Sequence, residues 1–304
     1  MLSETLQDVV SKTSSTDVLL KKLEAKIFSL VGGDSYSQTS SPQSDATLAA
    51  RYHLQVGGER IRGRCAIHVG LALGLSESDT VCIAASAELL HNASLVHDDL
   101  QDKDDTRRGA PAVWTKYGPN VAICTGDLML SAAYAALCDL SETHHIPALI
   151  SLVHERTLSA VRGQCADLAA RQQLLITVDS YISIAIAKSG ALLSLPLELA
   201  LIAAGRKNWT TQARNAAEAF AVAYQIADDL ADVLLDRASG SMNIIFVLES
   251  EDSGVDATAV ARRLGSQHID EAVALSHALP CNAGSVLGKL SLELRRTFAM
   301  GKNS

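Results

Sequence analysis

Apolar residues recur along most of the chain at the spacing that marks one face of an α-helix. From about residue 46 onward, long segments rich in Ala and Leu show this period. Short polar stretches containing Gly, Pro or Ser interrupt them at residues 70–78, 109–119, 141–147 and 205–211. Patterns that alternate between apolar and polar residues, as in β-strands, are scarce. The chain is therefore expected to fold as a bundle of helices.

Two of the expected helices are long and contain neither Gly nor Pro. The first covers residues 78–104, with Ser76 or Ser78 as its N-cap, and the second covers residues 211–236. A stretch rich in Ser, Gln and Thr, residues 35–44, is expected to form a loop after a short N-terminal helix.

The domain organisation follows from the absence of an internal linker. No stretch rich in Pro, Gly or Ser divides the middle of the sequence, so we expect a single domain over residues 1–304. Residues 1–45 would form the N-terminal helix and loop, and residues 46–304 the helical bundle. Because 48% of the residues are hydrophobic, the chain has enough apolar surface for a large core.

Composition excludes several classes of partner. The formal net charge is −8 and no basic stripe is present, which argues against nucleic acid. No charge-free run of about 18 apolar residues and no signal-peptide pattern appear, so we expect a cytoplasmic protein without stable membrane insertion. The six cysteines are scattered without zinc-site spacing and are expected to be reduced core residues.

Acidic clusters with the same DDxxD spacing occur in both long helices, at residues 98–102 and 228–232. The spacing places carboxylates at i and i+4, where like charges repel by a few tenths of a kcal/mol. A single cluster of this kind is typical of a solvated helix face. Here both clusters directly follow apolar runs, at residues 89–96 and 220–227, so each lies where a buried face becomes acidic. Because Mg²⁺ takes one or two carboxylates plus water and phosphate oxygens, the pair predicts a metal-diphosphate site.

Two arginines, Arg107 and Arg108, follow the first cluster. An isolated pair at this place would be explained by the negative end of the helix dipole. Beside an acidic metal site, their bidentate, charge-assisted hydrogen bonds suit the oxygens of a diphosphate.

Residues 91–109, HNASLVHDDLQDKDDTRRG, resemble the first aspartate-rich motif of the trans-prenyl diphosphate synthase family. Residues 224–232, YQIADDLAD, resemble the second motif. Weaker matches follow the family order at residues 57–62, 126–127, 163–167 and 188–189. The likeness covers about residues 52–236. It implies an all-α, single-domain helical bundle of the class I isoprenoid synthase type with a central apolar cavity, and a homodimer.

The resemblance also assigns roles to residues of this chain. Mg²⁺ would be bound by the motif aspartates Asp98, Asp102, Asp228 and Asp232. The allylic substrate would be held by Arg107, Lys188, Ser189 and Gln225. The diphosphate of isopentenyl diphosphate would be held by Arg62, His91 and Arg108. The implied enzyme is a Mg²⁺-dependent prenyltransferase that ionises an allylic prenyl diphosphate and couples it to isopentenyl diphosphate, with Asp98, Asp102, Arg107, Lys188 and Asp228 as its catalytic residues.

Product length in this family depends on residues one helical turn before the first cluster, here Ala93 and Ser94. Neither side chain is bulky, so a geranylgeranyl or longer product is expected. The alternative is that both are merely small residues at which helices pack.

Two departures from the family pattern concern cations. Glu59 stands where the family has a lysine that contacts isopentenyl diphosphate, and Arg60 or Arg64 would have to compensate. The segment after the second cluster, residues 234–247, is short and contains no lysine, so that Arg237 is its only cation.

These departures leave two alternatives open. A class I terpene cyclase or a non-standard prenyl coupling enzyme would use the same metal-triggered ionisation. Cyclases stabilise cations with aromatic rings, and an aromatic content of 4% favours elongation instead. A non-catalytic subunit of a partner prenyl synthase is the other alternative, against which the retention of all six motif aspartates argues.

Overall fold

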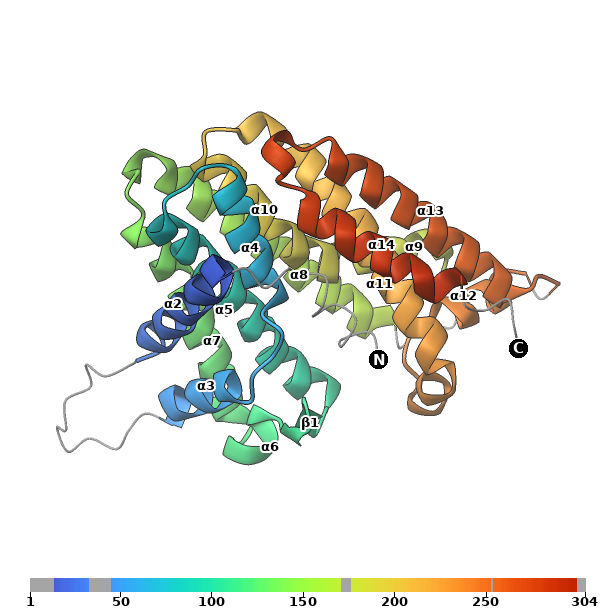
Figure 1. The fold of residues 1–304 in the computed structure, drawn as a ribbon. Helices are drawn as coiled ribbons and strands as arrows, with labels where there is room; N and C mark the ends of the chain where they lie inside the picture. The colour runs from blue at the N-terminus through green and yellow to red at the C-terminus, as the bar shows by residue number, and fades with distance from the viewer. Residues whose placement is uncertain (1–13, 33–44, 171–175, 253, 300–304) are drawn as a thin grey trace. The chain divides into compact units, whose positions relative to one another are not determined.

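The computed structural model describes residues 14–32, 45–170, 176–252 and 254–299 (Figure 1). Most of these residues are helical, as the apolar periodicity predicts. The expected loop at residues 35–44 lies outside the described residues. By their internal contacts, the described residues form two compact units. We call residues 12–153 with 202–205 the N-terminal unit, and residues 154–201 with 206–304 the C-terminal unit. The single-domain expectation stays a prediction.

The N-terminal unit holds the helices from α2 to α7 and one small hairpin. Its elements are α2 (Ser14–Leu30), α3 (Asp45–Gln55), α4 (Ile61–Ala72), α5 (Glu77–Asp102), β1 (Thr106–Arg107), β2 (Ala110–Pro111), α6 (Val113–Tyr117), α7 (Pro119–Ala135), η1 (Ala136–Asp139) and η2 (Thr143–His145). Helix α5 packs against α4, α7 and α2, and its apolar residues belong to the core.

The boundaries of α5 agree with the prediction to within two residues. Ser76 is its N-cap, and the Ser76 hydroxyl accepts a hydrogen bond of 3.0 Å from the Asp79 N–H. At the other end, Lys103 adopts the left-handed conformation and ends the helix one residue after Asp102. The expected break at residues 109–119 is more ordered than predicted, because it contains strand β2 and helix α6.

The C-terminal unit begins within α8 (Ile146–Ala170). Its further elements are α9 (Val178–Ala185), the π-helix η3 (Ile186–Gly190), α10 (Ala191–Ala203), η4 (Lys207–Trp209), α11 (Thr210–Ser239), α12 (Ile244–Glu251), α13 (Ala257–His277), η5 (Pro280–Asn282) and α14 (Ser285–Ala299). Helix α11 packs on α13 and α14, and it includes the predicted second long helix.

Within the described part of the chain, two stretches are long and apolar enough to cross a membrane by length and composition, Pro119–Asp139 and Val178–Ala203. The second is 78% buried, as expected of a core helix in a soluble protein. The first is 44% buried. Such a finding is weak evidence for a membrane span, and the absence of membrane insertion stays a prediction.

Candidate active site

The first aspartate cluster contains two kinds of side chain. Asp98 and Asp102 are partly exposed near the end of α5, whereas Asp99 is completely buried. Asp99 accepts a hydrogen bond of 2.8 Å from Arg107 Nε and forms an ion pair with the same guanidinium group. Burial raises the pKa of Asp99, and Arg107 opposes that shift. The middle aspartate therefore anchors an arginine, while the outer two face the surface.

Hydrogen bonds fasten the loop that carries Arg107. The carbonyl of Asp105 accepts from the Ala112 N–H at 2.9 Å and from the Thr115 hydroxyl at 3.0 Å. The Trp114 indole donates to the Asp104 carbonyl at 2.8 Å, and the Tyr52 hydroxyl of α3 donates to the Pro111 carbonyl at 2.8 Å. Helices α3 and α6 thus hold the hairpin that presents the arginine.

Arg62, His91, Arg107 and Arg108, the predicted diphosphate ligands of this unit, lie near one another. Burial and the charges of Arg62 and Arg108 lower the pKa of His91 well below its ordinary value, so the imidazole is neutral at pH 7. Its Nδ1 is buried and makes no hydrogen bond within the described part of the chain. Arg108 has a φ of 54° and donates to the Gly57 carbonyl. This cationic group suits an anion, although its ligand stays a prediction.

Arg60 does not compensate for Glu59. Its side chain is buried, and its Nε donates to Glu24 Oε1 at 2.6 Å. Its Nη2 also donates to the Leu54 carbonyl at 2.9 Å. Arg64 lies beside Glu59 but donates to its main-chain carbonyl at 2.9 Å.

The predicted chain-length residues, Ala93 and Ser94, are both small, and their role in product length stays a prediction. Ala93 is buried, and the Ser94 hydroxyl donates to the His91 carbonyl at 2.8 Å. The weak motif match at residues 126–127 has a packing reason: a Cβ on Gly126 would lie 2.1 Å from His97 Nε2. The glycine therefore allows α7 to approach the histidine of the first motif.

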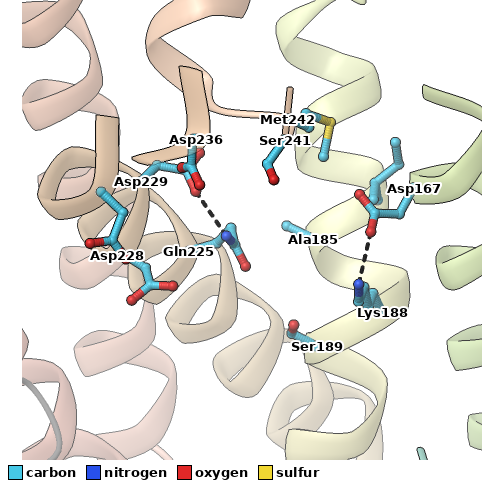
Figure 2. A pocket seen from close by; sticks show the side chains of 12 residues that line it. Asp167, Ala185, Lys188, Ser189, Gln225, Asp228, Asp229, Asp236, Ser241 and Met242 are labelled. Carbon is cyan, nitrogen blue, oxygen red and sulfur yellow. Dashed lines mark hydrogen bonds and ion pairs between the residues drawn. The ribbon is translucent and has the colours of Figure 1, made fainter. Parts of the chain in front are cut away.

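The second aspartate cluster lines an open hollow of about 180 Å³ in the C-terminal unit. Figure 2 shows Asp167 and Lys188 on one wall, and Gln225, Asp229 and Asp236 on another. The lining also includes Ser189, Asp228, Asp232, Ser241 and Met242. All the predicted site residues of this unit therefore line one hollow, together with Asp167 and Asp236, which the site prediction omitted.

Lys188 is placed by a close approach of two helices. It lies on the π-helix η3, a feature that occurs often at functional sites. Its Nζ is 2.8 Å from Asp167 Oδ2 of α8. A Cβ on Gly163 would lie 2.4 Å from the Lys188 backbone nitrogen, so only glycine fits there without movement. Gly163 and Asp167, which appeared as a weak motif match, thus position the lysine.

The middle aspartate of this cluster, Asp229, is also buried. It accepts hydrogen bonds from the Tyr181 hydroxyl at 2.8 Å, Gln225 Nε2 at 2.8 Å and the Ile244 N–H at 2.7 Å. Burial raises the pKa of Asp229 to about 6, against the effect of these three bonds. Gln225, a predicted substrate ligand, therefore gives one amide hydrogen to Asp229.

Sequence reasoning missed the distinct role of the middle aspartates, although a signal for it was present. Asp229 lies three and seven residues after Ile226 and Val222, both completely buried, and so shares their helix face. Asp99 lies in the same way after Val96 and Asn92. The helical period therefore distinguishes Asp99 and Asp229 from their neighbours Asp98 and Asp228, but not from Asp102 and Asp232, which lie three residues further along the same face.

The outer aspartates suit a hard divalent cation. Partial burial and the charges of Asp232 and Asp236 raise the pKa of Asp228, and a bound cation would relieve that repulsion. Among the described residues, no three His, Cys, Asp or Glu side chains form a set that could hold a metal ion by themselves. Mg²⁺ takes one or two carboxylates and completes its shell with water and phosphate oxygens, and a Mg²⁺ site here stays a prediction.

A family model described as polyprenyl synthetase matches residues 44–242. The chain belongs to the polyprenyl synthetase family. The match confirms the family resemblance that the two aspartate motifs indicated. It includes every residue to which the resemblance assigned a role.

Two relatives are similar to this chain over part of their own length. The short chain isoprenyl diphosphate synthase of Methanothermobacter thermautotrophicus is 30% identical over 64% of this chain and 61% of the relative. The (2E,6E)-farnesyl diphosphate synthase of Mycobacterium tuberculosis is 34% identical over 57% of this chain and 48% of the relative. The chain thus spans less than two thirds of the length of either relative.

A solved structure shows the same fold. The geranylgeranyl pyrophosphate synthetase of Pyrococcus horikoshii is 22% identical, with a TM-score of 0.82 and coverage of 95% of this chain and 98% of that one. The all-α fold of the class I isoprenoid synthases is therefore confirmed.

Proposed function

We propose that the chain is a Mg²⁺-dependent trans-prenyl diphosphate synthase that condenses isopentenyl diphosphate with an allylic prenyl diphosphate. The observation that carries the proposal is the common design of the two aspartate clusters. In each, the middle aspartate is buried and hydrogen-bonded, and the outer carboxylates face the surface. A merely solvated acidic face would not bury one carboxylate of each pair at a cost in desolvation.

The reaction begins with ionisation of the allylic substrate. Its carbon–oxygen bond breaks, and the diphosphate leaves with both electrons. Mg²⁺ bound by Asp98, Asp102, Asp228 and Asp232 would supply positive charge to the departing diphosphate. Arg107, held by Asp99 in the N-terminal unit, and Lys188, held by Asp167 in the C-terminal unit, would each donate hydrogen bonds to diphosphate oxygens. Ser189 and Gln225 would complete its binding.

The second step forms the new carbon–carbon bond. The double bond of isopentenyl diphosphate attacks the allylic cation, and loss of one proton restores a double bond. Arg62, His91 and Arg108 would hold the diphosphate of this second substrate; the neutral imidazole would act as a hydrogen-bond donor. With Ala93 and Ser94 before the first cluster, a geranylgeranyl or longer product is proposed.

A second candidate function is supported by the shortage of cations. Arg60 is bonded to Glu24, and Arg237 pairs with Glu249 at 3.1 Å while its guanidinium group lies over the Phe246 ring. Neither replaces the missing lysines as it stands. A terpene cyclase binds no isopentenyl diphosphate and would therefore tolerate Glu59 in place of the lysine that contacts this substrate. A non-standard coupling enzyme with another acceptor would tolerate it for the same reason. A non-catalytic subunit would need neither step.

A homodimer and a cytoplasmic location stay predictions.

Product analysis by mass spectrometry distinguishes these functions. Purified protein is incubated with Mg²⁺ and dimethylallyl, geranyl or farnesyl diphosphate, with and without isopentenyl diphosphate. Elongated diphosphates support the proposed synthase. Release of hydrocarbon from an allylic diphosphate alone would instead identify a cyclase, and no turnover with any donor would favour the subunit.

A further inference from the structure

The segment after the second aspartate cluster has a compact structure of its own. Helix α11 continues to Ser239, and Gly240 ends it in the left-handed conformation with an N–H bond to the Asp236 carbonyl. Helix α12 begins only four residues later, at Ile244. Its N-cap is Asn243, whose side chain is completely buried. The short connection thus brings one buried amide directly against α11.

The Asn243 side-chain amide makes three hydrogen bonds, two from Nδ2 and one to Oδ1. Its Nδ2 donates to the Asp229 main-chain carbonyl at 2.8 Å and to Asp236 Oδ2 at 2.7 Å. Its Oδ1 accepts from the Ile245 N–H at 2.9 Å and so caps α12. Asparagine offers two donors and one carbonyl acceptor, which matches this set.

The two contacts on α11 lie on either side of a kink. Asp232, between Asp229 and Asp236, has φ −110° and ψ 15°, which is not helical. Kinks of this kind occur where a side chain enters the hydrogen-bond ladder of a helix. Asn243 supplies a donor to the carbonyl before the kink and holds the carboxylate after it.

The same junction fixes the buried aspartate of the cluster. The Asp229 carboxylate accepts from the Ile244 N–H at 2.7 Å and from the Tyr181 hydroxyl at 2.8 Å. Helices α9, α11 and α12 therefore meet in one hydrogen-bonded network. Asp229, which this network holds, is next to Asp228 and three residues before Asp232 on α11, and these two aspartates are the predicted metal ligands.

We infer that Asn243 is a positioning residue: by holding α11 on both sides of Asp232, it sets the places of Asp228, Asp232 and Asp236 for Mg²⁺. The inference rests on the proposed function. It also assigns a role to the lysine-free segment at residues 234–247, because the Asn243 amide fixes the carboxylates before Mg²⁺ binds. Partners that orient metal ligands commonly contribute 10–100-fold to metal affinity.

Asn243→Ser separates the positioning role from the capping role. Serine is about as good an N-cap as asparagine, so α12 keeps its cap. Its shorter side chain cannot reach both the Asp229 carbonyl and the Asp236 carboxylate. The matched control is Asp256→Ala in the same unit, which removes the N-cap bond of 3.0 Å from Asp256 to the Ala259 N–H of α13.

The measurement is a calorimetric titration of Mg²⁺ in the presence of saturating inorganic pyrophosphate, together with the thermal midpoint of each variant. We expect Asn243→Ser to weaken Mg²⁺ binding about tenfold or more. Asp256→Ala should lower the thermal midpoint but leave the Mg²⁺ affinity within about twofold of that of the unchanged protein.

Tyr181→Phe provides a second, milder variant, since it deletes only the hydroxyl bond to Asp229. We expect it also to weaken Mg²⁺ binding, and by less than Asn243→Ser does, because one of three hydrogen bonds to the Asp229 carboxylate is lost. If neither Asn243→Ser nor Tyr181→Phe weakens binding more than the control, the positioning role is wrong. If the unchanged protein binds no Mg²⁺ with pyrophosphate, the proposed function fails and the inference fails with it.

Discussion

Gly163→Ala tests how Lys188 is placed. The added Cβ would lie 2.4 Å from the Lys188 backbone nitrogen, 2.7 Å from the Ala187 carbonyl carbon and 2.8 Å from the Lys188 Cα. All three neighbours are backbone atoms, so no side chain can turn away. Because ordinary contact begins near 3.4 Å, the π-helix must move about 1 Å away from α8.

The movement has separate effects on stability and on activity. Overpacking costs about 1–3 kcal/mol, and the better helix propensity of alanine returns up to about 1 kcal/mol. The net loss of about 0–3 kcal/mol should lower the thermal midpoint by a few degrees. A displacement of about 1 Å at a positioned group can cost about 100-fold in rate. We therefore expect a large fall in kcat/KM for the allylic diphosphate with little loss of stability.

The assay compares Gly163→Ala with Gly288→Ala by steady-state kinetics and thermal unfolding. Gly288 lies in α14, and a Cβ there would meet its nearest neighbour at 3.4 Å, which is ordinary contact. This control should retain full activity. If Gly163→Ala retains it too, with an unchanged thermal midpoint, the close approach of α8 does not position Lys188.

Three further predictions concern other residues. Burial lowers the pKa of the His53 imidazole from 6.5 to about 3 in the folded protein. As pH drops from about 6.5 toward 3, the imidazole is protonated in the unfolded chain but not in the folded one, so the free energy of unfolding falls. His53→Gln should remove about 2 kcal/mol of this loss at pH 5, measured by denaturant titration. Asp99→Ala should cost about 2 kcal/mol of unfolding free energy, because Arg107 loses its hydrogen bonds to the buried Asp99 and keeps only the ion pair of 3.7 Å with Asp104; an unchanged denaturation midpoint would contradict this. Arg237→Ala should change stability by less than about 1 kcal/mol and leave turnover intact, since its ion pair with Glu249 is exposed; a large fall in kcat would show that Arg237 does replace the missing lysines.

The sequence predicted the parts of the fold that depend on local pattern. The apolar period and Ser76 fixed helix α5 to within two residues. The kink at Asp232 was not predictable in this way, because it depends on the buried amide of Asn243, eleven positions further along the chain. The π-helix at Lys188 likewise depends on a close approach to Gly163 of another helix.

The sequence predicted which residues form the candidate site, but it did not predict which of its aspartates are buried. Both DDxxD spacings and the cations around them were identified from the sequence. The difference between Asp98 and Asp99, or between Asp228 and Asp229, depends on which side of the helix faces the core. The partners of Arg60 and Arg237 are non-local contacts, so only the structure shows that both are already engaged.

Incubation with Mg²⁺, isopentenyl diphosphate and farnesyl diphosphate, followed by mass spectrometry of the products, tests the proposed function most directly. Asp98→Ala and Asp228→Ala serve as test variants, and Asp17→Ala, an exposed aspartate in α2, serves as the control. We predict a geranylgeranyl or longer diphosphate from the unchanged protein and from Asp17→Ala, and its loss in both cluster variants. Formation of the same product by Asp98→Ala and Asp228→Ala, or its absence from the unchanged protein, would contradict the account.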